Sequence, residues 1–308
     1  MSTRIAIVCG PTGSGKTTFA IDLVQHLDAE IVSADSMQIY RYMDIGTAKP
    51  TLKEQADARH HLIGVVDPDI SFDAACYVQR ADNVIQDIVK RGKIPLIVGG
   101  TGLYIKALTH GLFNISKVNP EIRHRLKGKL KAHGHAYLHH YLEKVDPAAA
   151  ARIHVRDTQR LIRALEVFES TGQPISLAQK AHSFDRQRYQ TLKIGLKMDR
   201  KALYNKINLR VDTMLANGFL EEVKKLLEMG YPPEIKSMQA LGYRHMAHYL
   251  RGRLSFDDAV RTLKRDHRRY AKRQMTWFGA DQEINWLTPD QKNVALKLLR
   301  EFFRHHWH

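Results

Sequence analysis

The sequence contains little cysteine and lacks long apolar segments. Its 308 residues include only Cys9 and Cys76, too few for a disulfide framework and without the Cys/His spacing of a zinc site. No apolar run is long enough to cross a membrane, and the first residues enter a strand-like run with no signal peptide before it. We find no internal repeat and no low-complexity stretch. These absences predict a chain of the reducing cytoplasm.

Acidic residues are scarce relative to basic ones. Lys and Arg number 48 against 32 Asp and Glu, which gives a formal net charge of +16. An enzyme for a small anionic metabolite does not need this excess, whereas nucleic acid is the simplest large anionic partner. The alternative is a generally basic surface with no polymer ligand. A membrane surface is disfavoured because neither end carries a separate, strongly amphipathic basic helix.

The first third of the chain alternates β-rich apolar runs with helical patterns. The expected strands are Arg4–Cys9, Glu30–Ala34, Leu62–Val66 and Ile94–Val98. The expected helices are Lys16–Leu27, Asp73–Lys90 and Gly102–His110. This alternation predicts an α/β fold, with a P-loop NTPase-like parallel sheet flanked by helices on both faces.

The pattern changes at about Asn114, where basic helices begin. They are expected at Pro120–His133, His135–Val145 and Asp157–Thr171. A strand-like alternation returns over Leu192–Met198, and later helices include a long one from Ser255 to Phe278 and a last one over Val294–Phe303. We therefore expect residues 1–115 and 190–308 to form the α/β core with C-terminal helices. Residues 116–189 are expected to form a helical insertion domain.

A phosphate-binding motif follows the first expected strand. Its glycines let backbone N–H groups turn inward around a phosphate, and the helix beginning near Lys16 adds its positive N-terminal end. Lys16 supplies a point charge, and the Thr17 hydroxyl can bind Mg²⁺. A chance match in a glycine turn is the alternative, and the motif alone does not identify a reaction. The motif, G-x-x-x-x-G-K-[ST], comprises Gly10, Pro11, Thr12, Gly13, Ser14, Gly15, Lys16 and Thr17.

Two more loops follow expected strands at the same edge of the sheet, where ligands bind in such folds. Asp35 and Ser36 come after the second strand. Asp35 has three interpretations, as a Mg²⁺ ligand, a general base or a turn-forming residue, and its place beside a P-loop favours a catalytic role. Thr101, in the loop Gly99–Gly102, offers a hydroxyl to the crevice and is also compatible with a helix cap. The tight turn Gly46–Pro50 carries a lysine that can close over a phosphate.

Two segments carry concentrated positive charge. Arg156, Arg160 and Arg163 are expected on one helix face, which can follow a nucleic-acid backbone or form a solvated face with Glu/Arg pairs. Six Lys or Arg residues fall within residues 264–273, a density that is costly by self-repulsion unless anions approach. The aromatic Trp277 that follows is either a core anchor or a stacking surface, and we favour the core.

Seven motifs in this order resemble the tRNA dimethylallyltransferase (tRNA isopentenyltransferase) family, in the compact bacterial form without a zinc-finger extension. The resemblance runs from the first strand to about Trp277. Gly13 and His245 depart from the commoner family residues without removing a proposed catalytic group. The motifs are Gly10–Thr17, Asp35–Tyr40, Gly46–Pro50, Val98–Tyr104, Arg160–Glu166, Gln239–Arg244 and Tyr270–Trp277.

The resemblance implies transfer of a dimethylallyl group from dimethylallyl diphosphate to the exocyclic amine of the adenine 3′ to the anticodon in tRNA. Asp35, Thr101 and Lys16 would be catalytic, with Mg²⁺ on Thr17 and the P-loop holding the diphosphate. Asp35 would act as a full base or only as an orienting acceptor, and the protein is expected to act as a monomer. The residues implied to contact tRNA are Asp35, Ser36, Met37, Gln38, Thr101, Arg123, Gln159, Arg160, Leu161, Ile162, Arg163, Ala240, Leu241, Gly242, Tyr243, Arg244 and His245.

Two other functions remain open at this stage. A small-molecule kinase accounts for the P-loop and the α/β order, but not for the charge or the late basic helix. A non-catalytic RNA-binding ATPase module accounts for the charge, but gives Asp35 and Thr101 no joint purpose.

Overall fold

The computed structural model describes residues 3–112, 119–182 and 187–304. The chain divides into two compact units, one formed by residues 1–109 and 188–308 and the other by residues 110–187. The expected boundary between residues 115 and 116 lies outside the described residues. Among the described residues, no helix is both long enough and apolar enough to span a membrane.

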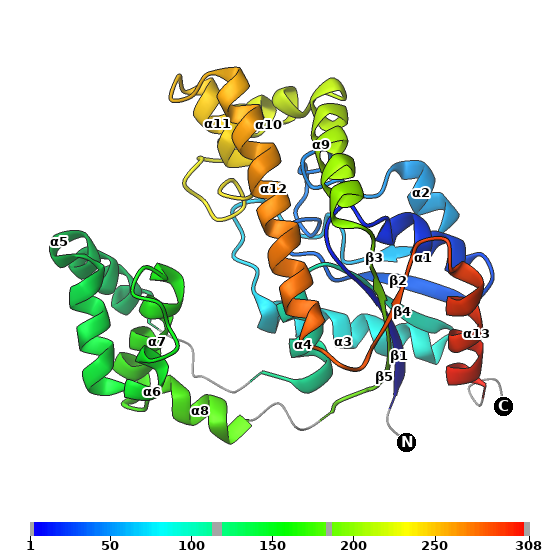
Figure 1. Ribbon diagram of the computed structural model, residues 1–308, viewed down its shortest axis with the longest axis horizontal. Helices are drawn as coiled ribbons and strands as arrows, with labels where there is room; N and C mark the ends of the chain where they lie inside the picture. The colour runs from blue at the N-terminus through cyan, green and yellow to red at the C-terminus, as the bar shows by residue number, and fades with distance from the viewer. Residues whose placement is uncertain (1–2, 113–118, 183–186, 305–308) are drawn as a thin grey trace. The chain divides into compact units, whose positions relative to one another are not determined.

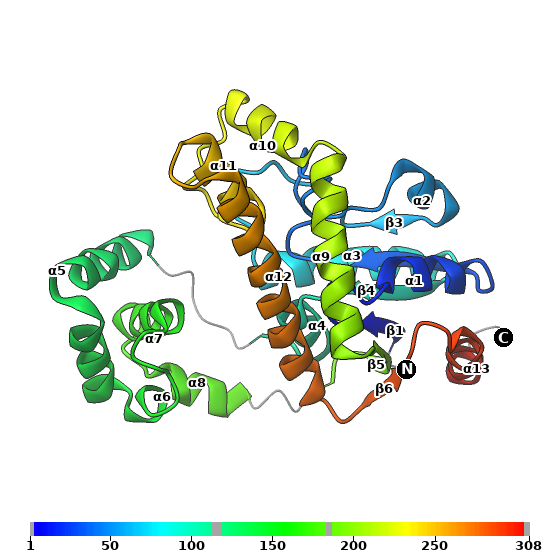
Figure 2. The same cartoon turned by 45° about the horizontal axis from the view of Figure 1, so that its top comes forward.

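The larger unit is built on one parallel sheet whose described strands follow the order β3-β2-β4-β1-β5-β6 (Figures 1 and 2). β1 lies inside the sheet and pairs with β4 on one side and β5 on the other, both in parallel. The expected α/β fold with a parallel sheet is therefore confirmed. The strands are β1 (Arg4–Cys9), β2 (Ala29–Ser33), β3 (His60–His61), β4 (Ile94–Gly99), β5 (Gln190–Leu196) and β6 (Ile284–Leu287).

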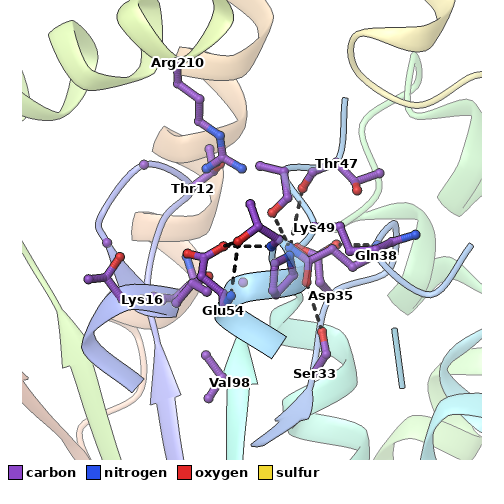
Figure 3. Close-up of a pocket in the computed structure, with 18 of the residues that line it drawn as sticks. Thr12, Lys16, Ser33, Asp35, Gln38, Thr47, Lys49, Glu54, Val98 and Arg210 are labelled. Carbon is purple, nitrogen blue, oxygen red and sulfur yellow. Dashed lines mark hydrogen bonds between the residues drawn. The ribbon is translucent and has the colours of Figure 1, made fainter. Parts of the chain in front are cut away.

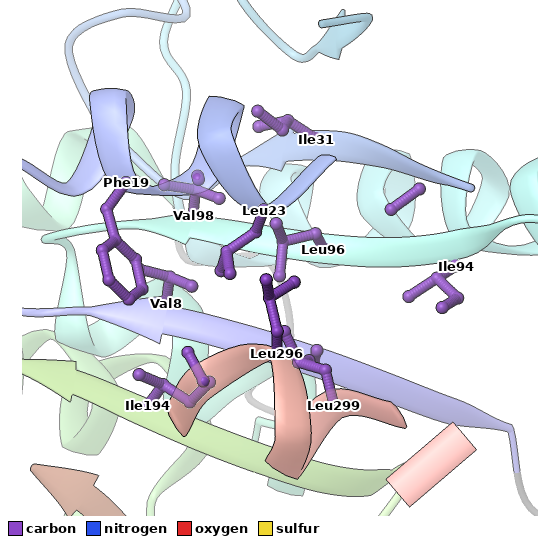
Figure 4. Packing of buried hydrophobic residues seen from close by; sticks show 14 of the residues in the cluster. Val8, Phe19, Leu23, Ile31, Ile94, Leu96, Val98, Ile194, Leu296 and Leu299 are labelled. Atoms are coloured by element: carbon purple, nitrogen blue, oxygen red, sulfur yellow. The ribbon is translucent and has the colours of Figure 1, made fainter. Parts of the chain in front are cut away.

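Helices cover both faces of this sheet. Alternate strand residues such as Val8, Leu96 and Ile194 form an apolar cluster with α1 (Lys16–Val24) and α13 (Lys292–Phe303) on one face (Figure 4). The crossover through α3 (Ala74–Lys90) runs back across the sheet, so a right-handed connection places it on the opposite face. There the ring of Tyr77 stacks on Tyr104 of α4 (Gly102–His110) with centroids 4.4 Å apart. The central strands are thus buried on both faces, as their continuous apolar runs require.

The sheet edges differ from the sequence-based expectation. The expected strand Leu62–Val66 is wrong, because β3 is His60–His61, which pairs with Ile31 and Val32. Leu62 and Gly64 have φ values of 61° and 58°, so the chain turns out of the extended conformation there. β6 was not among the expected strands, and it pairs with β5 at the other edge.

Four helices lie over the carboxyl ends of the strands, namely α9 (Arg200–Ala216), α10 (Phe219–Glu228), α11 (Tyr243–Leu250) and the long helix α12 (Phe256–Gly279), and a fifth, α2 (Leu52–Asp57), lies beside β3. The hydroxyl of Ser255 accepts a hydrogen bond from the Asp258 N–H at 3.1 Å, which confirms the expected N-cap of the long helix. The long helix packs against α9 and α11, and α9 and α12 lie side by side in both ribbon views (Figures 1 and 2).

The smaller unit is helical throughout its described elements. Gly134, with φ 79°, interrupts the first helix where a break between two helices was expected. The buried leucines Leu126, Leu138, Leu142 and Leu165 form its separate apolar core. The unit contains α5 (Pro120–Val145), α6 (Pro147–Ala150), α7 (Thr158–Thr171) and α8 (Ile175–His182).

Candidate active site

A cavity of about 820 Å³ lies at the carboxyl ends of β1, β2 and β4. Side chains from distant parts of the larger unit, including Lys16, Asp35 and Arg210, are directed into it (Figure 3). The loop after β4 contributes Gly99 and Gly100, whereas Thr101 is not part of the wall. The structure therefore brings the P-loop, the Asp35 loop and the glycine loop together around one space, as their positions after parallel strands predict.

The P-loop has the backbone conformation of a phosphate cradle. Gly10, Gly13 and Gly15 all have positive φ values, between 82° and 145°, which only glycine adopts without strain. α1 begins at Lys16, so its N-terminal N–H groups open toward the cavity. The hydroxyl of Ser14 is buried beneath the loop without a hydrogen-bond partner.

Lys16 supplies a cation at the floor of the cavity. Its Nζ donates to the carbonyl of Pro11 at 2.7 Å. Burial lowers the pKa of Lys16 to about 8, while the negative charge of Asp35 acts in the opposite direction. The ammonium form still predominates at pH 7. A bound anion beside it favours that form further.

Asp35 is held by a turn of its own. Its Oδ1 accepts hydrogen bonds from the N–H groups of Met37 at 2.8 Å and Gln38 at 3.3 Å. Thr101 reaches the same turn, because its Oγ1 accepts from the Ser36 N–H at 3.0 Å. The turn-forming interpretation of Asp35 is therefore correct, and the residue also lines the cavity. The two roles are compatible because Oδ1 serves the turn and leaves Oδ2 for another partner.

The loop Gly46–Pro50 forms part of the cavity wall and is held in place by hydrogen bonds to its backbone and from its lysine. Gln38 Nε2 donates to the carbonyl of Ala48 at 3.1 Å, and Lys49 Nζ donates to the carbonyl of Tyr40 at 2.7 Å. Lys49 also pairs with Asp44. The lysine of this loop thus braces the loop itself and also lines the cavity, and its closing over a phosphate stays a prediction.

Glu222 of α10 anchors the start of this loop. Its carboxylate accepts hydrogen bonds from three successive backbone N–H groups, those of Asp44, Ile45 and Gly46, at 2.7–3.1 Å. The hydroxyl of Tyr243 donates to the same carboxylate at 2.6 Å. Tyr243 is fully buried, so its contribution to the site is support for the cavity wall.

Arg210, Tyr270 and Gln274 line the cavity although the sequence predicts no role for them there, and Tyr270 and Gln274 fall within the motif Tyr270–Trp277. Arg210 of α9 extends over the P-loop, with Nη1 3.4 Å from the Thr12 hydroxyl. Burial lowers its pKa, and Asp35 opposes that shift. Tyr270 and Gln274 enter from α12. None of the three belongs to a local phosphate-binding motif. The helical periodicity of the sequence places them on the buried faces of α9 and α12, but it does not indicate which residues or ligands they contact.

Trp277 does not serve as the core anchor that the sequence favours, because it is 43% exposed. The indole lies against the backbone of Gly102, where an added Cβ would come within 2.2 Å of the ring. The aromatic character of the residue predicted burial, whereas its position near the end of α12 leaves much of the ring at the surface.

The motif residues of α11 are mostly enclosed. Gly242 and His245 are buried, and burial lowers the pKa of the His245 imidazole. Arg244 pairs with Asp266 of α12 at 2.7 Å and keeps part of its side chain exposed. Ala240 and Leu241 are half-buried.

The expected RNA-contacting residues of the smaller unit divide into three groups. Gln159 and Arg160 are exposed, whereas Leu161 and Ile162 are buried in the core of the unit and present no side chain to a partner. Arg123 binds the buried Glu166 through two hydrogen bonds of 2.8 and 3.1 Å, and Arg163 binds it at 3.0 Å. Arg156 precedes α7, so it does not share a helix face with the other two arginines as expected.

A divalent cation would have few protein ligands here. Among the described residues, no three His, Cys, Asp or Glu side chains are grouped so that they could hold a metal. Thr17 and Asp35 line the cavity together. Mg²⁺ commonly retains several waters and takes most other ligands from phosphate oxygens, so one hydroxyl at the P-loop suits it only with a phosphorylated ligand.

Comparison with known proteins identifies the family. A profile of the family described as IPP transferase matches residues 38–281. The tRNA dimethylallyltransferase of Syntrophobacter fumaroxidans is 52% identical over 298 residues, which cover 96% of this chain and 87% of that protein. The chain belongs to the IPP transferase family. The enzyme of the same name from Desulfosudis oleivorans is 50% identical over 98% of this chain and 96% of its own length.

Solved structures of related proteins support the same family membership. The full-length tRNA isopentenylpyrophosphate transferase of Bacillus halodurans superposes with a TM-score of 0.73 at 39% identity, covering 99% of this chain and 98% of that one. A eukaryotic dimethylallyltransferase acting on tRNA gives a TM-score of 0.79 at 28% identity, over 94% of this chain and 74% of that one. The family resemblance found in the sequence motifs is therefore confirmed.

Proposed function

We propose that this chain transfers the dimethylallyl group of dimethylallyl diphosphate to the N6 amine of adenine at position 37 of tRNA, with release of diphosphate. The observation that supports this most strongly is the presence of Lys16 and Asp35 in one cavity. An anion-binding cradle and a proton-accepting carboxylate on opposite sides of one space are what such a substitution needs. Family membership selects this reaction from others that use a P-loop.

The P-loop half of the cavity takes the diphosphate. The backbone N–H groups of Gly13 to Thr17, with Lys16 and Arg210, surround the position where negative charge develops as the allylic C–O bond breaks. Thr17 is the residue that would bind Mg²⁺, together with diphosphate oxygens and water. When bound, Mg²⁺ neutralises part of the charge on the leaving diphosphate.

The Asp35 half takes the adenine. The N6 lone pair forms the new bond to the allylic carbon, the bond from that carbon to the diphosphate oxygen breaks, and one N6 proton passes to Asp35. Because an adenine amine is a weak nucleophile, correct placement supplies much of the rate. The base must leave the anticodon-loop stack to reach the cavity. Thr101 and Ser36 hold the Asp35 turn in place through their hydrogen bond.

Contacts with tRNA come from both units. In the larger unit the basic residues of α12 and the exposed part of Arg244 suit a phosphate backbone. In the smaller unit Gln159 and Arg160 offer exposed polar groups, while Arg123 and Arg163 shape the surface through Glu166. We expect one copy of the chain to bind one anticodon stem-loop.

The test is incubation with dimethylallyl diphosphate, Mg²⁺ and an anticodon stem-loop, followed by mass spectrometry of the nucleosides. The expected product is one adenosine carrying one five-carbon unit. The kinase and ATPase alternatives predict ADP when ATP and RNA are supplied. Release of ADP, with no prenylated adenosine under either condition, would reject the transferase.

A further inference from the structure

The side chain of Gln274 joins two loops of the cavity from α12. Its Oε1 accepts a hydrogen bond from the backbone N–H of Thr12, and its Nε2 donates to the backbone carbonyl of Gly100, both at 2.8 Å. Gln274 is 6% exposed, its bond to Gly100 is buried, and its bond to Thr12 is partly buried at the cavity wall. Such bonds are costly to break, because a buried partner is left unsatisfied.

The loop after β4 is shaped to receive this amide. A Cβ added at Gly100 would lie 2.3 Å from Nε2 of Gln274. Any other residue at position 100 would therefore push the glutamine away or displace the loop. Gly100 and Gln274 form a matched pair, although they are 174 residues apart in the chain.

The two bonded backbone groups lie next to the two halves of the reaction site. Thr12 precedes the amides Gly13 to Thr17 of the phosphate cradle. Gly100 precedes Thr101, whose hydroxyl holds the turn of Asp35 through the Ser36 N–H. The amide of Gln274 thus spans from the loop that holds the leaving group to the loop that supports the proton acceptor.

We infer that Gln274 is a positioning residue that fixes the separation between the bound diphosphate and Asp35. This inference rests on the proposed function. The glutamine takes no part in bond making, since its two amide groups are both engaged with backbone. Its effect arises because a displacement of about 1 Å between reacting groups can cost about a hundredfold in rate.

Two substitutions test the hydrogen bonds that Gln274 makes to Thr12 and Gly100, one by removing both bonds and the other by removing only the bond to Gly100. Gln274→Met keeps the length of the side chain and removes both bonds, so kcat should fall about tenfold to a hundredfold. The Kd for dimethylallyl diphosphate, measured by calorimetry, should change less than about threefold, because Lys16 and the cradle amides of Gly13 to Thr17 remain and neither lost bond is made to the ligand. Gln282→Met is the matched control, since Gln282 is an exposed glutamine in the turn before β6.

Gln274→Glu adds a readout that a purely structural role would not move. A carboxylate can accept from Thr12 N–H but cannot donate to the Gly100 carbonyl, whereas the protonated acid can do both. Burial and the adjacent carbonyl raise the pKa of such a carboxyl group. The kcat of this variant, divided by that of the wild type, should therefore rise as pH falls from 8.5 to 6. Lys16, Asp35, Arg210 and Tyr270 line the same cavity in both proteins, so division by the wild-type kcat isolates the effect of position 274.

The outcomes are distinct. Wild-type kcat in folded Gln274→Met, or a pH-independent ratio for Gln274→Glu, would overturn the inference. If Gln274→Met lowers Tm strongly, the kcat ratio of Gln274→Glu to the wild type decides, because its change with pH is followed within one folded variant. Failure of the wild type to prenylate adenosine would instead reject the proposed function.

Discussion

Arg210 Nη1 lies 3.4 Å from the hydroxyl of Thr12, although 198 residues separate them in the chain. α9 carries the guanidinium over the P-loop, so the cradle has a cation above it as well as Lys16 within it (Figure 3). Arginine remains charged despite a pKa lowered by burial, and its planar donors suit phosphate oxygens. The proposed diphosphate site thus includes a residue outside the P-loop.

Replacing Arg210 with Gln should weaken binding of dimethylallyl diphosphate. Loss of a charge-assisted hydrogen bond costs about 1.5–3 kcal/mol, which is roughly tenfold to a hundredfold in Kd. Calorimetric titration of the folded variant measures this change. Lys201→Gln, at the exposed start of the same helix, removes an equal charge and should bind normally. An unchanged Kd for the Arg210 variant would mean that its guanidinium does not touch the ligand.

Asp35→Asn should leave the diphosphate bound and the chemistry slow. The amide oxygen can still accept from Met37 and Gln38, so the turn persists. The side chain can no longer take a proton, and kcat should fall about 10²–10⁴-fold. Lys16 also loses a favourable negative charge, so its pKa should fall below about 8. Single-turnover rates with saturating RNA give the result, and turnover close to wild type would remove Asp35 from the mechanism.

Arg160→Gln should reduce the salt dependence of RNA binding. Its side chain is 71% exposed, and its ion pair with Asp157 is long, at 3.6 Å. If it contacts one phosphate, the slope of log Kobs against log salt should become shallower by about 0.7–0.9. Lys297→Gln on α13 changes the net charge equally and serves as the control. Equal slopes in all three proteins would show that Arg160 faces no phosphate.

Glu30 should make the free energy of unfolding depend on pH in the acid range. Hydrogen bonds from Arg91, opposed by burial and aided by His61, lower the pKa of this carboxyl group to about 2. Because the folded pKa is below the usual 4.5, the carboxylate stabilises the fold above that pH and loses this effect as pH falls toward 2. The difference of 2.5 units corresponds to about 3 kcal/mol.

Urea unfolding of Glu30→Gln measures this contribution. At pH 7 the variant should be less stable than the wild type, and the gap should narrow at pH 3. Glu228→Gln on α10 is the control, because that side chain is 64% exposed and its pair with Lys224 is 3.9 Å long. A gap of the same size at both pH values would contradict the assigned pKa shift.

The parts of the fold that were predictable from sequence are those set by local signals. β1 is the apolar run Arg4–Cys9, α4 spans Gly102–His110 as expected, and Gly134 divides α5 because its positive φ suits glycine. The edge strands were less accessible. β3 has only two residues and depends on pairing with β2. The residues of Leu62–Val66 have high β-propensity, but the backbone turns there.

The site shows the same division. The P-loop, Asp35 and the glycine loop each follow a strand, so their convergence follows from parallel topology. Arg210 and Gln274 reach the cavity through helix packing across 198 and 262 residues, and no local pattern encodes those contacts. Trp277 and Arg156 show the converse error, since composition and spacing suggested burial and a shared helix face that the backbone does not provide.

The most direct test of the account is a stoichiometric measurement with doubly labelled dimethylallyl diphosphate, carrying ¹⁴C in the allyl group and ³²P in the diphosphate. In the presence of Mg²⁺ and an anticodon stem-loop, the account predicts one ¹⁴C fixed to adenosine for each diphosphate released, and neither event without RNA. Release of diphosphate without RNA, or ¹⁴C on any group other than the adenine amine, would contradict it.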